Sequence, residues 1–524
     1  MTLSANKTSY AFYVLCFLLL ISSGCASLPA NTERTFSTSL KDTASTEMGR
    51  YADKIGSLYP KKCGFYLLGN GQDALVARGQ LADLAERSLD IQYYLFHDDL
   101  VGGLLAYKLL QAADRGVRVR LLLDDMGLDN RDQEIAMLDR HPNIEIRIFN
   151  PFTRGIMRTV QLLTRFGSVT RRMHNKTFIA DNSAAILGGR NIGNEYFGND
   201  PDLAFGDLDV LTIGTVVKQV STSFDQYWNS ELSYPVSNLT GKISQGELAE
   251  TRAHWDKMWN LKKDSDYAEA LRNSTLFQKI LNNEVTLNFG TAKVLADKPE
   301  KISKEEQDRS YFLAPQLVKY LKKTQHELII LSAYFVPGKE GVAFLRSLVK
   351  QGVRVRILTN SLSSNDVILV HAGYARYRRD LLRAGIELYE IDKKMSHRDR
   401  KEKKGASGST GKASLHAKTF ILDREKVFIS SFNFDPRSVL ENTEIGIMID
   451  APDLARPMAE EFDEKINKLS FQLELTTEED GIELIKWVND KDGEQIVYKN
   501  DPYSSIWQRM LLFLAGSLPI ESQL

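Results

Sequence analysis

Two short clusters in the sequence combine histidine, lysine and aspartate with the spacing His-x-Lys-x4-Asp. Their members are His174, Lys176 and Asp181 in the first cluster, and His416, Lys418 and Asp423 in the second. One imidazole can attack phosphorus while another protonates the departing alkoxide. The ammonium groups can bind the phosphoryl oxygens and offset transition-state charge. The two clusters together predict catalysis on a phosphodiester with no metal ion and no other cofactor.

An asparagine follows each cluster at the same distance from its aspartate. Asn191 follows the tripeptide Gly-Gly-Arg in the sequence, and Asn433 follows Ser-Ser-Phe. Their amide groups can donate hydrogen bonds to the same phosphoryl oxygens. Because side chains alternate along a strand, the histidine and lysine of each cluster should share one strand face.

The matched clusters belong to an internal repeat. The two histidines lie 242 residues apart (416 minus 174), and the pentapeptide Gly-Val-Arg-Val-Arg recurs 236 residues apart, at 116–120 and 352–356. Since the two distances are nearly equal, the halves are collinear. Two homologous halves can bring one histidine each to a shared, pseudo-twofold interface.

Hydrophobic patterning indicates the same order of elements in both halves. Strand-like runs at 89–96 and 327–336 precede helix-like runs at 104–115 and 342–351, and another strand-like run follows each of these. Strands that alternate with helices predict an α/β fold with mainly parallel strands.

The chain of 524 residues is long enough for two or three domains. The repeat defines two halves, and a run with few turn-forming residues separates them. We predict six segments: a lipoprotein-type signal peptide (1–24), an N-terminal linker (25–59), a first half (60–245), a helical connector (246–286), a second half (287–475) and a C-terminal tail (476–524).

The N-terminus has the pattern of a processing signal. An apolar run of about a dozen residues follows Lys7, which is short for a bilayer span. The run ends at Ser22-Ser23-Gly24-Cys25, which resembles a bacterial lipobox with Cys25 as the lipidated residue. This predicts a lipid anchor in the bacterial cell envelope. The alanine that follows Cys25 favours the outer membrane, facing the periplasm, as the location. A plain signal or an uncleaved anchor is the alternative.

The two clusters resemble the paired HKD motifs of the phospholipase D superfamily, and the resemblance extends over about 60–475. It implies two α/β/α halves packed as a pseudo-twofold around one shared active site. It further implies that His174 forms a phosphatidyl-histidine intermediate and that His416 is general acid and then general base, although pseudo-symmetry leaves the reverse assignment open. Asp181 and Asp423 are mainly structural in this family.

The family resemblance also implies a later carboxylate that orients each histidine and fixes its tautomer. Glu444 fits this role in the second half. Asp207 fits best in the first half, with Asp209 as the second choice. Solvated strand ends are the alternative interpretation of these acids.

The string from Ser431 to Glu444 resembles bacterial cardiolipin synthases, and Gln92-Tyr93-Tyr94 indicates their C-type subgroup. The implied reaction is transphosphatidylation onto phosphatidylglycerol, with phosphatidylethanolamine or phosphatidylglycerol as the donor. His371 belongs to another matching string, where it either contacts a headgroup or is a surface or packing residue of a helix.

Three features favour a membrane surface as a partner. They are the anchor signal, the basic stretches at 151–173 and 393–413, and the apolar tail at 504–520. A solvated loop remains an equal interpretation of 393–413. The tail either lies at a membrane interface or docks on the core.

The overall charge argues against nucleic acid as the partner. The chain has 67 Lys and Arg against 68 Asp and Glu, a formal net charge of -1. A phospholipase D hydrolase that releases phosphatidic acid is the nearest alternative function, because it uses the same residues with water as acceptor. An HKD-type nuclease and a catalytically silent envelope scaffold are further alternatives.

Overall fold

The computed structural model describes residues 28–516, apart from residues 33, 129–130, 166, 199–202, 241–251, 254, 258, 261–263, 304–307, 366, 394–411 and 492–493. The predicted signal peptide, Cys25 and most of the basic stretch 393–413 lie outside the described residues. Cleavage and lipidation at Cys25 therefore stay predictions.

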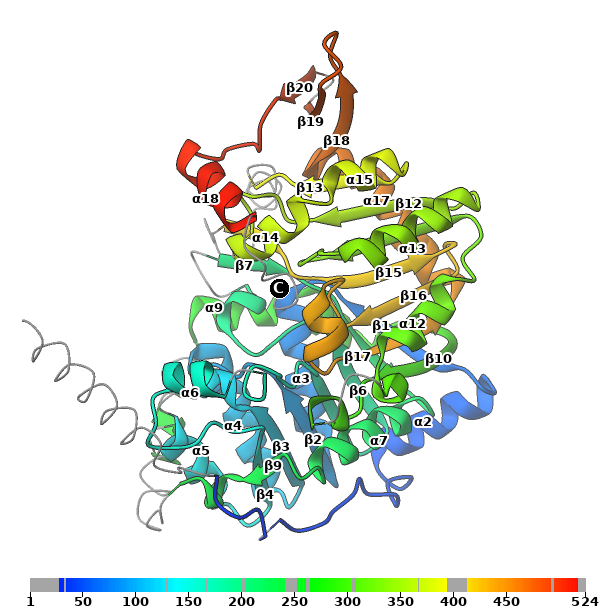
Figure 1. Ribbon diagram of the computed structural model, residues 1–524. Helices are drawn as coiled ribbons and strands as arrows, with labels where there is room; N and C mark the ends of the chain where they lie inside the picture. The colour runs from blue at the N-terminus through cyan, green and yellow to red at the C-terminus, as the bar shows by residue number, and fades with distance from the viewer. Residues whose placement is uncertain are drawn as a thin grey trace, which may run out of the picture.

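The first half forms one side of a long mixed sheet, which lies in the lower part of Figure 1. In spatial order its strands are β9 (Ser233–Pro235), β4 (Ile144–Phe149), β3 (Arg118–Asp124), β2 (Ser88–Tyr93), β5 (Thr177–Ala180), β6 (Ala184–Gly188), β8 (Asp209–Ile213) and β1 (Cys63–Leu68).

The second half repeats this order, and antiparallel pairing of β1 with β10 joins the two halves into one sheet. From that seam outward its strands are β10 (Asn288–Ala296), β17 (Ile445–Asp450), β16 (Lys426–Ser430), β15 (Lys418–Leu422), β11 (Glu327–Ser332), β12 (Arg354–Thr359), β13 (Glu387–Ile391), β18 (Ser470–Thr477), β19 (Glu483–Lys491) and β20 (Glu494–Tyr498). The predicted pair of homologous α/β halves is confirmed.

The expectation of mainly parallel strands is wrong. Only β2–β3–β4 and β11–β12–β13 pair in parallel within the large sheet of the described chain. The strands that follow the two histidines form tight hairpins, with positive φ at Asp181, Asn182, Asp423 and Arg424. A hairpin makes its strands antiparallel, and strand periodicity alone does not reveal that direction.

The repeated pentapeptide marks the same junction of helix and strand twice. Gly116 and Gly352 have φ of 93° and 91°, and each follows the last turn of a helix. The next residue donates its N–H to the carbonyl five residues back, from Val117 to Ala112 and from Val353 to Leu348. This is the helix ending that glycine favours, and the Val-Arg-Val run then begins β3 or β12.

Helices cover both faces of the sheet, and the two halves share part of their core. One cluster of buried side chains contains Val210 and Phe224 from the first half, with Ile447 and Phe462 from the second. The principal helices are α3 (Gly71–Leu84), α4 (Leu100–Asp114), α7 (Val217–Trp228), α12 (Ala314–Leu321), α13 (Gly338–Lys350) and α17 (Pro452–Leu469). Because the core crosses the pseudo-twofold, the halves are fixed relative to each other.

The remaining helices of the described chain vary in length, and two of them lie in the connector. They are α2 (Glu47–Leu58), α5 (Asp132–Leu138), α6 (Arg158–Thr164), α9 (Asp266–Arg272), α10 (Thr275–Leu281), α11 (Glu300–Ser303), α14 (Ile368–Ala375), α15 (Arg378–Arg383) and α18 (Ile506–Gly516). Among the residues that the structure describes, no helix combines the length and the apolarity needed to cross a bilayer.

Both predicted end segments make contacts with the folded halves. In the linker, the Ser39 N–H donates to the Asp225 carboxylate over 2.9 Å, and the Arg34 guanidinium donates to the Ser230 carbonyl. In the tail, β19 and β20 extend the sheet beyond β18. The six proposed segment boundaries stay predictions.

Candidate active site

The two predicted histidines each bind a carboxylate from the opposite half. His174 Nδ1 lies 2.8 Å from Glu444 Oε2, and His416 Nδ1 lies 2.5 Å from Asp207 Oδ2. We expected one orienting carboxylate in each half, and the structure exchanges the two across the interface. Asp209, the second choice, instead forms buried ion pairs with Arg78 and Arg190.

Backbone pairing between the halves produces this exchange. The His174 N–H donates to the Thr443 carbonyl over 2.9 Å, next to the residue Glu444. On the other side, β7 (Leu203–Gly206) pairs in parallel with β14 (Lys412–Leu415), and the His416 N–H donates to the Gly206 carbonyl over 2.7 Å. Each histidine is therefore placed beside a carboxylate by main-chain bonds that cross the pseudo-twofold.

The Nδ1 contacts fix the tautomer that the site can use. An ionised carboxylate is only an acceptor, so it favours a proton on Nδ1 of its histidine. This leaves Nε2 of His174 with a lone pair for attack on phosphorus. Burial lowers the pKa of His174 well below its usual value, and the nearby charges of Lys176 and Lys418 lower it further. Charged groups from both halves therefore lower the pKa of His174.

The two lysines are buried, and each follows its histidine by two residues where the chain enters β5 or β15, so the histidines themselves lie just before the strands. Lys176 Nζ donates to the His174 carbonyl over 2.7 Å, and Lys418 Nζ donates to the His416 carbonyl. Burial lowers the pKa of Lys176 to about 7; Glu444 opposes the shift, and Lys418 adds to it. An anionic phosphoryl group between the lysines would favour their charged forms.

The carboxylate of Glu444 is held by two hydroxyl groups besides His174. Ser431 Oγ lies 2.5 Å from Oε2, and Ser438 Oγ lies 2.9 Å from Oε1. Burial raises the pKa of Glu444 to about 7, although Lys176 and the serine bonds act in the other direction. Sequence reasoning did not select Ser431 or Ser438 as functional, although both lie in the string that carried the resemblance.

The carboxylate of Asp207 has different neighbours. It accepts the Leu208 N–H over 2.8 Å, and a Cβ added to Gly189 would come within 2.2 Å of its Oδ1. Gly189 therefore has to be glycine for Asp207 to reach His416. Burial opposes ionisation, but the charges of His416 and Lys418 lower the pKa of Asp207 overall.

Two aromatic rings that sequence reasoning missed flank the histidines. Tyr94 lies edge-on to His174 with ring centroids 5.0 Å apart, and Tyr196 lies edge-on to His416 at 5.2 Å. Such rings restrict imidazole rotation and limit the entry of water. Tyr94 stands in the Gln-Tyr-Tyr string, which was the one sequence signal available for it.

The two asparagines differ in the hydrogen bonds that they make within the protein. Asn191 accepts the Leu95 N–H over 3.3 Å and donates through Nδ2 to Tyr196 over 2.9 Å. Asn433 Oδ1 is buried with no hydrogen-bond partner among the described residues. Both asparagines are buried, and their binding of phosphate stays a prediction.

The aspartates of the two clusters lie at the far ends of β5 and β15, away from the histidines. Asp181 accepts the backbone N–H groups of residues 86–88, and Asp423 accepts those of residues 325–327. These bonds tie each hairpin to the start of the neighbouring parallel strand. The geometry is that of a structural anchor.

The basic stretch at 151–173 does not form a free cationic patch, which corrects the expectation from composition. Arg154 pairs with Asp125 and Asp132, and Arg172 pairs with Asp124 in the core. The same Asp124 accepts the Met173 N–H over 2.9 Å. These bonds position the segment that leads into His174.

His371 packs inside the protein and does not reach the site. It is 1% exposed, and its Nε2 lies 2.8 Å from the Arg378 guanidinium. Asp501 also binds Arg378, over 2.8 Å. The packing interpretation of His371 is therefore the one that the structure supports.

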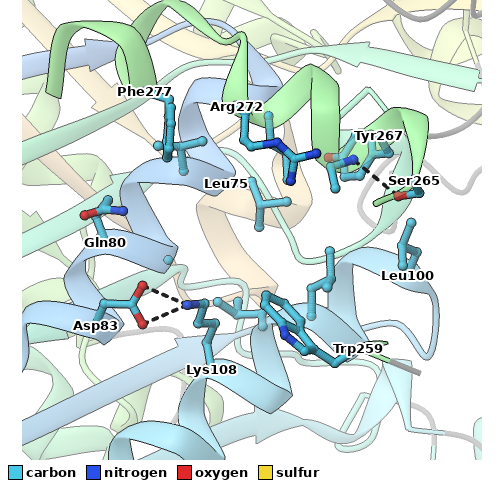
Figure 2. A pocket seen from close by; sticks show the side chains of 16 residues that line it. Leu75, Gln80, Asp83, Leu100, Lys108, Trp259, Ser265, Tyr267, Arg272 and Phe277 are labelled. Carbon is cyan, nitrogen blue, oxygen red and sulfur yellow. Dashed lines mark hydrogen bonds and ion pairs between the residues drawn. The ribbon is translucent and has the colours of Figure 1, made fainter. Parts of the chain in front are cut away.

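The described chain also contains a cavity and a group of possible metal ligands. A cavity of about 240 Å³ between α3, α4 and the connector is largely apolar, and an ion pair between Lys108 and Asp83 borders it (Figure 2). In the described chain, His97, Asp99 and Glu195 are close enough to share a metal ion. His97 binds Glu195, and Asp99 caps α4, so internal bonds account for that grouping.

Comparison with known proteins identifies the family. The family model described as "Cardiolipin synthase, PLD-like domain" matches the chain twice, over residues 80–228 and 317–466. Cardiolipin synthase C of Escherichia coli (strain K12) is 41% identical over 467 residues, which is 89% of this chain and 97% of that protein. Cardiolipin synthase B of Shigella flexneri is 24% identical and covers 73% of this chain and 75% of its own length.

A solved structure agrees with the fold. Phosphatidylserine synthase of Haemophilus influenzae Rd KW20 superposes with a TM-score of 0.54 and 13% sequence identity, covering 91% of this chain and all of that one. At this identity the likeness concerns the fold alone. Since the family model matches both halves and the 41% identity covers nearly the full length, the chain belongs to the cardiolipin synthase family of phospholipase D-like enzymes.

Proposed function

We propose that this protein is a phosphatidyltransferase that makes cardiolipin by transphosphatidylation onto phosphatidylglycerol. The observation that carries the proposal is the pair of buried histidines, each fixed by a carboxylate from the other half. Its relative named cardiolipin synthase C gives the substrate class.

In the first step, His174 Nε2 attacks the phosphorus of the donor lipid. The new P–N bond forms as the bond from phosphorus to the head alcohol breaks, and protonated His416 gives its proton to the leaving oxygen. Lys176 and Lys418 stabilise the charge on the phosphoryl oxygens. The product is a phosphatidyl-histidine and a free head alcohol.

In the second step, neutral His416 takes the proton from the terminal hydroxyl of phosphatidylglycerol. The alkoxide oxygen attacks phosphorus, the P–N bond breaks, and His174 returns to its starting state. Ethanolamine leaves in the first step if the donor is phosphatidylethanolamine, and glycerol leaves if it is phosphatidylglycerol. Water in place of the second lipid would give phosphatidic acid, the phospholipase D outcome.

The proposed location follows from the N-terminal sequence. We propose that Cys25 is lipidated after signal cleavage and holds the enzyme in the bacterial envelope, at the outer membrane facing the periplasm. Metabolic labelling with a fatty acid, followed by membrane fractionation, tests this proposal. A Cys25→Ala chain that still labels and fractionates as the wild type does would contradict it.

The reaction is tested with purified protein and labelled phosphatidylglycerol, with and without phosphatidylethanolamine. Cardiolipin that forms with wild type and disappears with His174→Ala supports the proposal, and dependence on phosphatidylethanolamine identifies the donor. Phosphatidic acid as the sole product would make the protein a hydrolase. A chain that cleaves oligonucleotides and leaves both lipids intact would favour the nuclease alternative.

A further inference from the structure

The C-terminal helix α18 presents apolar side chains to solvent. None of its residues is buried, and Trp507 is 68% exposed and Phe513 74%. Helix α14, against which α18 packs, adds the exposed side chains of Ile368 and Leu369. Contiguous exposed apolar surface of this kind commonly marks a site of interaction with a protein or a membrane.

This apolar surface lies near the active site. Helix α14 follows the carboxyl end of β12, and His416 enters β15 at the same edge of the sheet, because β15 runs antiparallel to β11. Tyr374 of α14 packs on Phe335 at 6.0 Å, and Phe335 packs on Phe434 at 5.3 Å. Phe434 directly follows Asn433, so two ring contacts connect α14 with the phosphate-binding candidate.

The first half adds exposed apolar groups at the corresponding edge of its own sheet. Helix α6 follows the carboxyl end of β4, and Met157 and Leu163 there are 72% and 84% exposed. Figure 1 shows α6, α14 and α18 along one side of the molecule, at the left of the view.

Neither helix contains an acidic residue, and the nearby Asp501, which precedes α18, is paired with Arg378. Arg509 is the only charged residue within α18, and α14 has none. Arg376, which follows α14, donates to the Ala515 carbonyl at the end of α18. An apolar surface with arginines and no acid on either helix is complementary to the headgroup layer of an anionic bilayer.

We infer that α14 and α18, together with α6, form a surface that docks on a bilayer containing anionic phospholipid and turns the shared active site toward the headgroups. The inference rests on the proposed lipid substrate. Helix α18 has 11 residues, and at 1.5 Å per residue its length is roughly 16 Å, about half the hydrocarbon thickness. It therefore lies along the interface, with Trp507 and Phe513 among the acyl chains.

The direct test is quenching of tryptophan fluorescence in the full-length chain by vesicles of phosphatidylglycerol and phosphatidylethanolamine with brominated acyl chains. We expect quenching in wild type and its clear reduction in Trp507→Phe, because bromine quenches only rings that reach the acyl region. Equal quenching in both proteins would overturn the inference. This readout does not depend on catalysis or on an anchor at the N-terminus.

A matched pair of variants tests the effect on the reaction. Trp507→Ser/Phe513→Ser removes two apolar groups from this surface, while Phe36→Ser/Leu58→Ser removes two groups of similar exposure, 81% and 62%, elsewhere. We expect the first variant to lose at least about tenfold in cardiolipin synthesis from vesicles but to retain activity on monomeric short-chain phosphatidylglycerol. The second should match wild type on both substrates.

The outcomes distinguish a membrane-docking role of this surface from a role in catalysis. Loss of activity by the surface variant on both substrates, or on neither, would overturn a docking role. A stable dimer of wild type that the surface variant cannot form, together with unquenched Trp507, would assign the surface to a second copy of the chain. Absence of cardiolipin from wild type would overturn the proposed function, while Trp507 quenching would still report membrane docking.

Discussion

The two histidine–carboxylate pairs have the same plan and different surroundings. At positions 242 residues apart, Gly189 leaves room for Asp207, whereas Ser431 donates to Glu444. Likewise Tyr196 packs on His416, whereas its counterpart Ser438 donates to Glu444. Duplication of the scaffold thus supplied equivalent positions, and side-chain differences at those positions gave the two pairs different properties.

The difference bears on which histidine attacks. Burial lowers the pKa of both, but for His416 the charge of Asp207 and its hydrogen bond oppose this shift. For His174 the largest influences after burial are the cations Lys176 and Lys418, which also lower its pKa. A neutral His174 suits the nucleophile, and a more easily protonated His416 suits the general acid.

The largest expected effect comes from removing either histidine. His174→Ala and His416→Ala should each reduce lipid transfer by about 10³-fold or more. With a phosphodiester that releases p-nitrophenolate, a leaving group that needs no proton, His416→Ala should recover first-step activity, and His174→Ala should not. Burst kinetics of p-nitrophenol release measures this, and the opposite recovery would exchange the two roles.

Removing the orienting charges should have the next largest effect. Asp207→Asn and Glu444→Gln should each reduce kcat by about 10²- to 10⁴-fold, because an amide no longer selects the Nδ1–H tautomer. We expect the smaller loss for Glu444→Gln, since burial raises the pKa of Glu444 to about 7 and the wild type is already partly neutral there. Comparison of kcat at one pH near 7 decides the order, with circular dichroism as the control for folding.

The pH profile should be a narrow bell near neutrality. As pH falls through about 7, Glu444 gains a proton and no longer holds its partner histidine as an anion would. As pH rises through about 7, Lys176 loses the proton that provides its charge. In the Lys176→Arg variant, the alkaline limb of the profile should shift to higher pH, because a guanidinium group stays charged. An alkaline limb that stays at the same pH would show that Lys176 does not cause it.

The smallest effects should come from the two aspartate anchors, and they should fall on stability. Asp181 is fully buried and Asp423 is partly exposed, so Asp181→Asn should cost more of the free energy of unfolding, within about 1–3 kcal/mol, than Asp423→Asn. Urea unfolding measures the difference. Retention of kcat per folded molecule in both would support their structural role, and a loss of several logs in either would contradict it.

Much of the site could be predicted because it is local in sequence. The His-x-Lys spacing of His416 and Lys418 identified the cluster, and the repeat offset identified the equivalent Asn191 and Asn433. The packing of Tyr94 against His174 could not be predicted, since the two residues lie far apart in the chain. The bond from Ser438 to Glu444 spans only six residues, but periodicity does not show where that hydroxyl points. The direction of β5 and β15 was also missed, because periodicity does not distinguish parallel from antiparallel strands.

Two homologous α/β halves, with one acid–base and phosphate-binding cluster each, could be predicted from the sequence alone. A repeated motif and its hydrophobic periodicity are properties of the linear chain. Only the tertiary structure decided that Glu444 serves His174 and that Asp207 serves His416. That exchange arises from main-chain bonds across the pseudo-twofold. The paired side chains lie 209 and 270 residues apart in sequence, where no local pattern records the partner.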